Sequence, residues 1–271
     1  MPKGALVKDS KRTYPPGSIV SGATGQPVTF DTMIQDLSGV RIVFIGESHT
    51  DAAHHAVQLK ILKALYPRVE GLRVGMEMFD APYQTVLDAW TSGKLDEKAF
   101  LERTHWYANW RYDFALYRDI LEFIRDNRIP LYGLNIPFHL TAKIAIGGIE
   151  SLSPEEKRHL PRSIDTSNAA HRAYVKKIFQ NHHLPGRDNF DYFYLAQCVW
   201  EDAMAEQAVA NLNGKFMVVL AGNGHIIKKF GIPDRVFQRI PLPFKTVYPV
   251  ASGDTAELSY GDYLWITPQK E

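Results

Sequence analysis

Two Gly-x-x-His motifs stand far apart in this chain, at residues 46–49 (Gly-Glu-Ser-His) and 222–225 (Gly-Asn-Gly-His). Each follows a short apolar run, 41–45 before the first motif and 216–221 before the second, which is typical of a buried strand. Open α/β sheets bind ligands at the carboxyl ends of their strands. The two histidines are therefore expected to lie together at one edge of a parallel sheet, in a ligand site.

Two further apolar runs also end in polar residues. The run 72–76 leads directly into Glu77, and the run 129–134 ends at Asn135. A glutamate in an apolar stretch is costly to bury unless it has a partner, so Glu77 is expected to face the same site. The residues predicted to form the site edge are Glu47, His49, Glu77, Asn135 and His225.

Imidazole and carboxylate groups together suit zinc, manganese or iron(II). His49, His225 and Glu77 are the candidate ligands of a divalent metal, and Glu47 or Glu77 could then act as a general base on metal-bound water. His54 is a further candidate ligand, although His54 and His55 also fit a solvated helix face. A third interpretation is that the strand-end residues only satisfy one another, with His49 and His225 hydrogen-bonded to Glu47 and Glu77.

The segment 106–112 packs four aromatic residues and one arginine into seven positions. It could form the wall of a flat apolar ligand with a polar edge, such as a porphyrin; core packing of the helices is the alternative. Tyr and His are haem iron ligands, and an arginine can pair with a propionate. The candidate wall residues are Phe79, Tyr83, Trp106, Trp110, Arg111 and Tyr112.

Composition excludes several classes of function. The 271 residues carry a net charge of +1, which gives no electrostatic argument for nucleic acid as a partner. No run of about 18 apolar residues exists, so no transmembrane segment is expected. Cys198 is the single cysteine, so no intrachain disulfide can form.

The acids at 201 and 202 lie on a predicted helix and are interpreted as a solvated face. Asp202 is the candidate exception.

Strand-like and helix-like segments alternate along most of the chain, which predicts an α/β fold with a mostly parallel sheet flanked by helices. Residues 1–30 are expected to form an extended arm, and residues 31–271 a single domain. The block at about 137–212 holds no convincing strand and is predicted to be a helical insertion over the carboxyl edge of the sheet. Asp31 is expected to cap the first helix.

Five motifs in this order resemble the ChaN-like haem-binding proteins: the motif at 46–49, the run 75–79, the Trp106/Trp110 pair, the stretch 134–137 and the motif at 221–225. The resemblance implies haem as the cofactor and a role in bacterial iron or haem acquisition. It also implies a lipid-anchored envelope protein and a homodimer with haem at its interface. The chain shows no signal peptide and no lipobox cysteine, which leaves the location open.

ChaN-like proteins are part of a broader Tiki and erythromycin-esterase-like group, which includes metal-dependent proteases and an esterase. Carried over by motif, Glu47, His49, Glu77 and His225 would be the shared core. The alternative function is therefore a metal-dependent hydrolase that uses both Gly-x-x-His motifs and Glu77.

Overall fold

The fold centres on an eight-stranded sheet in the order β4-β3-β11-β9-β5-β8-β6-β7. The structure is a computed structural model and describes residues 4–181, 186 and 188–270. The six strands from β11 to β7 run parallel, whereas β3 and β4 are antiparallel to their neighbours. The bounds are β3 Ile19–Ser21, β4 Pro27–Val28, β5 Ile42–Ile45, β6 Arg73–Asp80, β7 Leu131–Asn135, β8 Met217–Leu220, β9 Phe244–Ala251 and β11 Tyr263–Thr267. The predicted α/β class is confirmed.

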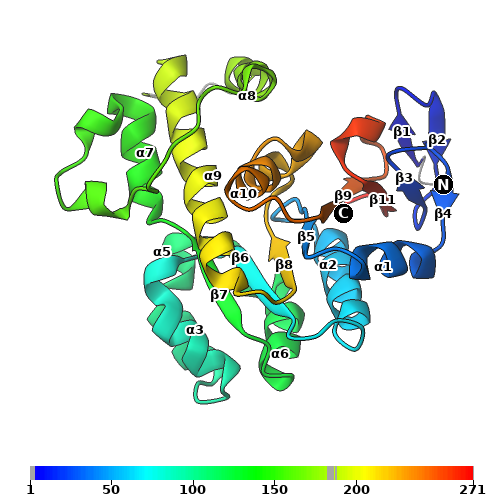
Figure 1. The fold of residues 1–271 in the computed structure, drawn as a ribbon, viewed down its shortest axis with the longest axis horizontal. Coiled ribbons are helices and arrows are strands. Elements are labelled where there is room, and N and C mark those ends of the chain that lie inside the picture. The colour runs from blue at the N-terminus through cyan, green and yellow to red at the C-terminus, as the bar shows by residue number, and fades with distance from the viewer. Residues whose placement is uncertain (1–3, 182–185, 187, 271) are drawn as a thin grey trace.

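Helices flank both faces of this sheet (Figure 1). They are α1 Phe30–Ser38, α2 Ala52–Leu65, α3 Gln84–Thr91, α4 Glu97–Thr104, α5 Trp106–Asn109, α6 Arg118–Asp126, α7 Phe138–Gly147, α8 Ala169–Asn181, α9 Phe190–Leu212 and α10 Ile232–Arg239. The prediction that Asp31 caps α1 was wrong. Thr29 is the cap, because its hydroxyl accepts a hydrogen bond of 3.1 Å from the backbone N–H of Thr32.

Strand β5 is a central strand of the sheet and carries apolar side chains on both of its faces. Val43 and Ile45 pack into the core on the α2 and α6 side, whereas Ile42 and Phe44 pack against α9 and α10. Side chains alternate across a strand, so a strand buried on both faces must be apolar at every position. The sheet therefore holds the carboxyl end of β5, where residues 46–49 begin, in a rigid setting.

Residues 4–28 contribute four short strands. β1 (Ala5–Val7) and β2 (Arg12–Tyr14) join β10 (Thr255–Ala256) in a small sheet of order β10-β1-β2, while β3 and β4 extend the edge of the main sheet. The segment is thus paired with residues from the far end of the chain. The division into an arm and one domain stays a prediction.

Between β7 and β8 the described residues form helices, short 3-10 turns and connecting loops, and no strand. The long helix α9 runs beside α7 and α10 and crosses the sheet (Figure 1). No helix in the described part of the chain is both long and apolar enough to cross a membrane.

Candidate functional site

The predicted strand ends meet at one edge of the sheet. β5, β8, β6 and β7 are consecutive neighbours in the sheet, so the residues that follow them come together at its carboxyl edge. A cavity of about 320 Å³ opens there. It is lined by His49, Glu77, Met78, Asp80, Asn109, Trp110, Arg111, Tyr112, Asn135, Phe138 and Trp200.

Glu47 and His49 form a carboxylate–imidazole pair on the α2 side of this cavity. Glu47 is buried, and its Oε1 lies 2.6 Å from His49 Nδ1 and accepts a hydrogen bond of 2.9 Å from the Tyr117 hydroxyl. Burial alone would raise the pKa of Glu47, but hydrogen bonds from His49 and His55 hold it below its usual value. Since Glu47 occupies Nδ1, the Nε2 of His49 is the nitrogen left for a ligand.

Trp110 and Tyr112 surround the His49 ring. Their ring centroids lie 4.8 and 5.0 Å from that of His49, whose side chain is 28% exposed. Burial lowers the pKa of His49, but Glu47 and Glu77 outweigh it and raise the pKa above its ordinary value. His49 is thus an oriented imidazole that is partly exposed to solvent beside Trp110 and Tyr112.

His225 lies between two buried carboxylates. Its Nε2 is 3.4 Å from Glu77 Oε1 and its Nδ1 is 3.3 Å from Glu201 Oε1. Burial lowers its pKa, but Glu77 and Glu201 together raise it to about 10. The pKa of Glu77 falls to about 2 against its own burial, through His225, His49 and the Gly222 N–H, which donates to Oε2 at 2.6 Å. The two carboxylates therefore favour the protonated form of His225, whose Nδ1 also lies 3.1 Å from the Gln197 amide nitrogen.

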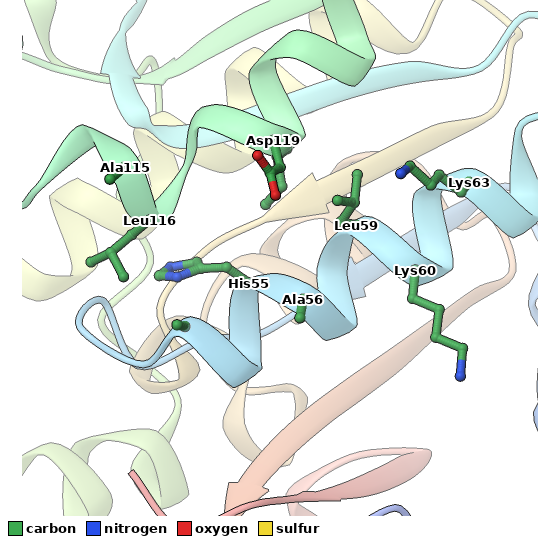
Figure 2. A pocket seen from close by; sticks show the side chains of 10 residues that line it. His55, Ala56, Leu59, Lys60, Lys63, Ala115, Leu116 and Asp119 are labelled. Carbon is green, nitrogen blue, oxygen red and sulfur yellow. The ribbon is translucent and has the colours of Figure 1, made fainter. Parts of the chain in front are cut away.

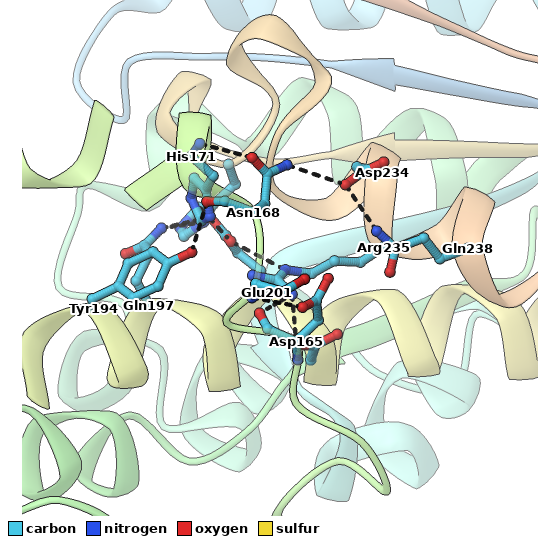
Figure 3. A network of polar contacts seen from close by, with 12 residues as sticks. Asp165, Asn168, His171, Tyr194, Gln197, Glu201, Asp234, Arg235 and Gln238 are labelled. Carbon is cyan, nitrogen blue, oxygen red and sulfur yellow. Dashed lines mark hydrogen bonds and ion pairs between the residues drawn. The ribbon is translucent and has the colours of Figure 1, made fainter. Parts of the chain in front are cut away.

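Behind His225, a buried ionic network anchors Glu201 (Figure 3). Arg235 Nε lies 3.3 Å from Glu201 Oε2, and its NH1 donates to Asp202 at 2.7 Å. His171 lies 3.4 Å from Glu201 Oε2, and Gln197 donates to Oε1 at 2.7 Å. The network joins α8, α9 and α10 to the second Gly-x-x-His motif.

The chain is similar to proteins of a known family. A family model described as "Haem-binding uptake, Tiki superfamily, ChaN" matches residues 33–236. The chain belongs to this family. No curated relative matches it.

Solved structures share the fold of this ChaN-family chain. ChaN of Campylobacter jejuni, in a structure described as cofacial heme binding, superposes with a TM-score of 0.73 at 21% identity, over 91% of this chain and 95% of that one. The type III effector HopBA1 gives 0.51 at 15% identity, over 89% and 93%. A mutant of the erythromycin esterase EreC in its open conformation gives 0.51 at 14% identity, over 86% and 77%. These likenesses show the fold alone.

Glu201 is the site residue that the sequence interpretation of this ChaN-family chain missed. Glu201 and Asp202 are each 0% exposed, so the interpretation of these acids as a solvated face was wrong. One signal could have found them. Their helix is apolar on all sides, which indicates a buried helix whose acids need cationic partners.

The predicted solvated face at His54 and His55 was also wrong, because each residue is only 3% exposed. His54 Nδ1 accepts a hydrogen bond of 2.9 Å from the Ser48 N–H, and its Nε2 lies 3.4 Å from Asp51. His54 is absent from the cavity lining. His55 Nε2 pairs instead with the second carboxylate oxygen of Glu47.

Some of the predicted haem-wall residues line the cavity, whereas others pack in the core. Trp110, Arg111 and Tyr112 line the cavity. Phe79 and Trp106 are 2% and 1% exposed and pack against each other in the core. The Tyr83 hydroxyl lies beside the cavity and accepts a hydrogen bond of 2.9 Å from Asn109.

Asn135 holds the backbone of the site rather than a ligand. Its Nδ2 donates to the carbonyl of Glu77 at 3.0 Å and its Oδ1 accepts from the Ile136 N–H at 2.9 Å. As for a divalent metal, the described residues contain no group of three His, Cys, Asp or Glu side chains that could hold one. The metal role of His49, His225 and Glu77 stays a prediction.

The His225 pairing predicts a pH-dependent stability. Because the folded pKa of about 10 exceeds the ordinary 6.5, the pairing contributes fully below pH 6.5, and this contribution is lost as the pH rises towards 10. We therefore expect the difference in free energy of unfolding between the wild type and His225→Gln to shrink over this range. Urea unfolding at a series of pH values measures it; a difference independent of pH between 6.5 and 10 would contradict the ionised pair.

Proposed function

We propose that this protein binds haem at the strand-edge cavity and takes part in haem or iron uptake. Membership of the ChaN family is the observation that carries the proposal. The aromatic walls of the cavity, formed by Trp110, Tyr112, Phe138 and Trp200, support it. At about 320 Å³ the cavity is at the small end of ligand pockets, so part of the macrocycle would lie across the mouth, where Phe138 is 41% exposed.

His49 is the proposed iron ligand. A metal-ligating histidine typically donates its other ring N–H to a carboxylate, which fixes the ring and raises its basicity. His49 Nδ1 lies 2.6 Å from Glu47 Oε1, which accepts this hydrogen bond and leaves Nε2 for the metal. Bound haem would supply an iron centre that an imidazole can ligate. Tyr112, on the same wall, is the second candidate ligand.

Polar groups at the cavity suit the carboxylates of a haem. Arg111 makes no ion pair with any described residue and lies over the Phe138 ring at 5.8 Å, so its guanidinium remains able to pair with a propionate. The buried indole N–H of Trp200 has no hydrogen-bond partner among the described residues. Burial raises the pKa of Asp80 to about 7, which weakens its repulsion of an anionic ligand.

A homodimer with haem at its interface is part of the proposal. The structure of ChaN from Campylobacter jejuni is described as cofacial heme binding. Here α5 and α7, which contribute Asn109 and Phe138 to the cavity lining, carry the exposed apolar residues Tyr107, Phe138 and Ile146. Exposed apolar groups of this kind are typical of interaction surfaces. A role in uptake would place the protein in the cell envelope.

A haemin titration followed by absorbance tests the proposal. We expect a saturable Soret shift, together with a doubling of the mass measured by light scattering after size exclusion. Iron-free protoporphyrin IX is the control: it should bind more weakly because it lacks the metal that His49 would ligate. The absence of any spectral shift at micromolar haemin would refute haem binding, and a shift without a change in mass would refute the haem-bridged dimer.

A hydrolase is the second candidate, because the Glu47–His49 pair also has the geometry of an oriented general base. It would act on a substrate held in the same cavity. Purified protein should then hydrolyse ester substrates and lose that activity in His49→Ala. The metal-dependent form predicts stoichiometric divalent metal in the same samples.

A further inference from the structure

Asp80, the last residue of β6, lines the strand-edge cavity without a partner. Its side chain is half-buried, yet its carboxyl group makes no hydrogen bond or ion pair with any described residue. Burial raises the pKa of this carboxyl to about 7. Because removing a carboxyl group from water without a partner costs free energy, such a group at a cavity is a candidate for contact with a ligand.

An irregularity in β6 brings Asp80 to the cavity. Between Met76 and Asp80, β6 advances four residues while β7 advances only two. Residues three apart on a regular strand point to opposite faces, so the bulge allows Glu77 and Asp80 to line one cavity. Gly133 on β7 permits this path, because a Cβ there would lie 2.7 Å from the Asp80 carbonyl oxygen.

The Asp80 side chain is not used as a helix cap either. It precedes the 3-10 turn η1 (Ala81–Tyr83), where an aspartate commonly accepts a hydrogen bond from the second or third N–H. The second residue is Pro82, which has no N–H, and Asp80 makes no capping hydrogen bond. The carboxyl group is therefore left for a ligand.

Charged and titratable groups approach Asp80 from several elements. Those that line the strand-edge cavity with it are His49, Glu77, Arg111 and Tyr112. Those that line a neighbouring cavity beside η1 are Arg158, His159 and Glu206. In the described part of the chain, none of them pairs with Asp80.

A ligand carboxylate suits this cavity better than an amine does. The charge of Arg111 would repel an ammonium group and attract a carboxylate. A carboxyl group that is kept neutral by an apolar setting can donate a hydrogen bond. The bond is strong when a carboxylate accepts it, because the acceptor is charged.

We propose that Asp80 holds a propionate of the bound haem as a neutral carboxylic acid that donates a hydrogen bond to it. The inference rests on the proposed binding of haem at the strand-edge cavity. The propionate would raise the pKa of Asp80 above its value of about 7 in the haem-free protein. The hydrogen bond is therefore complete below pH 7 and is lost as the pH rises through the pKa of the complex. Alkaline conditions thus favour release of the haem.

Soret titrations of the wild type and of Asp80→Asn, from about pH 6 to about pH 9, test this contact. Asparagine keeps the size and an N–H donor but cannot ionise. The two proteins should bind haemin alike at the acid end. Above pH 7 the wild type should weaken relative to the variant by up to about tenfold per pH unit, the effect of one linked proton. The ratio of the two dissociation constants removes effects that both proteins share, such as protonation of His49.

Two further measurements separate the hydrogen bond from a general charge effect. Carbon-13 NMR of haem-free, aspartate-labelled protein should show a carboxyl resonance that titrates near 7 and is absent from Asp80→Asn. Asp80→Leu, which has no donor, should bind haemin at least about tenfold more weakly than the wild type at about pH 6.

Asp119→Asn is the matched control, because Asp119 is exposed on α6 and lines a separate cavity between α2 and α6 (Figure 2). Its affinity should follow that of the wild type at every pH, and circular dichroism checks that all variants fold. A pH-independent ratio for Asp80→Asn would overturn the inference even if haemin binds. So would an Asp80 carboxyl that titrates near its ordinary 3.8, or an Asp80→Leu variant that binds as the wild type does. No Soret shift in any of these proteins would refute haem binding itself, and the inference with it.

Discussion

Haemin affinity is expected to fall by at least about 100-fold in His49→Ala. Loss of a partner that only orients a metal-ligating histidine typically costs about 10–100-fold, so loss of the ligand itself should cost more. The Glu47–His49 distance of 2.6 Å and the partial exposure of the ring in an aromatic cavity support this role. The measurement is the dissociation constant from a Soret titration, with folding checked by circular dichroism.

Glu47→Gln tests the orientation of the His49 ring separately from its proposed role as the iron ligand. It keeps the shape of the side chain but removes the charge that holds His49 Nδ1, so we expect an intermediate loss of about 10–100-fold. His139→Ala is the matched control, because that imidazole is 64% exposed and outside the cavity lining. If His49→Ala binds haemin within twofold of the wild type, the ligand is another residue, and Tyr112→Phe becomes the decisive variant.

The central strands could be predicted from the sequence because parallel strands buried on both faces are apolar throughout. The runs 41–45, 72–76, 129–134 and 216–221 became β5, β6, β7 and β8. The N-terminal strands could not be predicted in this way. β1 has only three residues and gains its partner β10 from Thr255–Ala256, a pairing between distant parts of the chain.

The site was predictable in part for a related reason. Residues that directly follow strands, such as His49 and Glu77, are placed by the sheet itself. Glu201 is placed by tertiary packing, since its partners Arg235 and His225 come from segments far along the chain. Periodicity within α9 cannot reveal that pairing, and composition alone makes an acid look solvated.

Arg235→Ala is expected to destabilise the protein by about 3–5 kcal/mol, the second large effect. Removal of one partner from a buried ionic network leaves the others as uncompensated buried charges. Arg235 is 3% exposed and contacts Glu201 at 3.3 Å and Asp202 at 2.7 Å. Urea unfolding at neutral pH measures the change. Lys215→Ala is the control: it breaks an ion pair with the exposed Glu70, which water screens, and should leave the stability almost unchanged.

A triple replacement distinguishes stability from positioning of His225. Arg235→Met, Asp202→Leu and Glu201→Leu remove three buried charges together, and apolar residues of similar size should recover part of the lost stability, since His171 and Arg239 lose their carboxylate partners. His225 then loses the Glu201 carboxylate at Nδ1 and keeps only the Gln197 amide there, so its pKa should fall from about 10. A stable triple variant with an unchanged His225 pKa would show that Glu77 alone charges the imidazole. A lowered pKa would mean that the network is needed to keep His225 cationic beside the cavity.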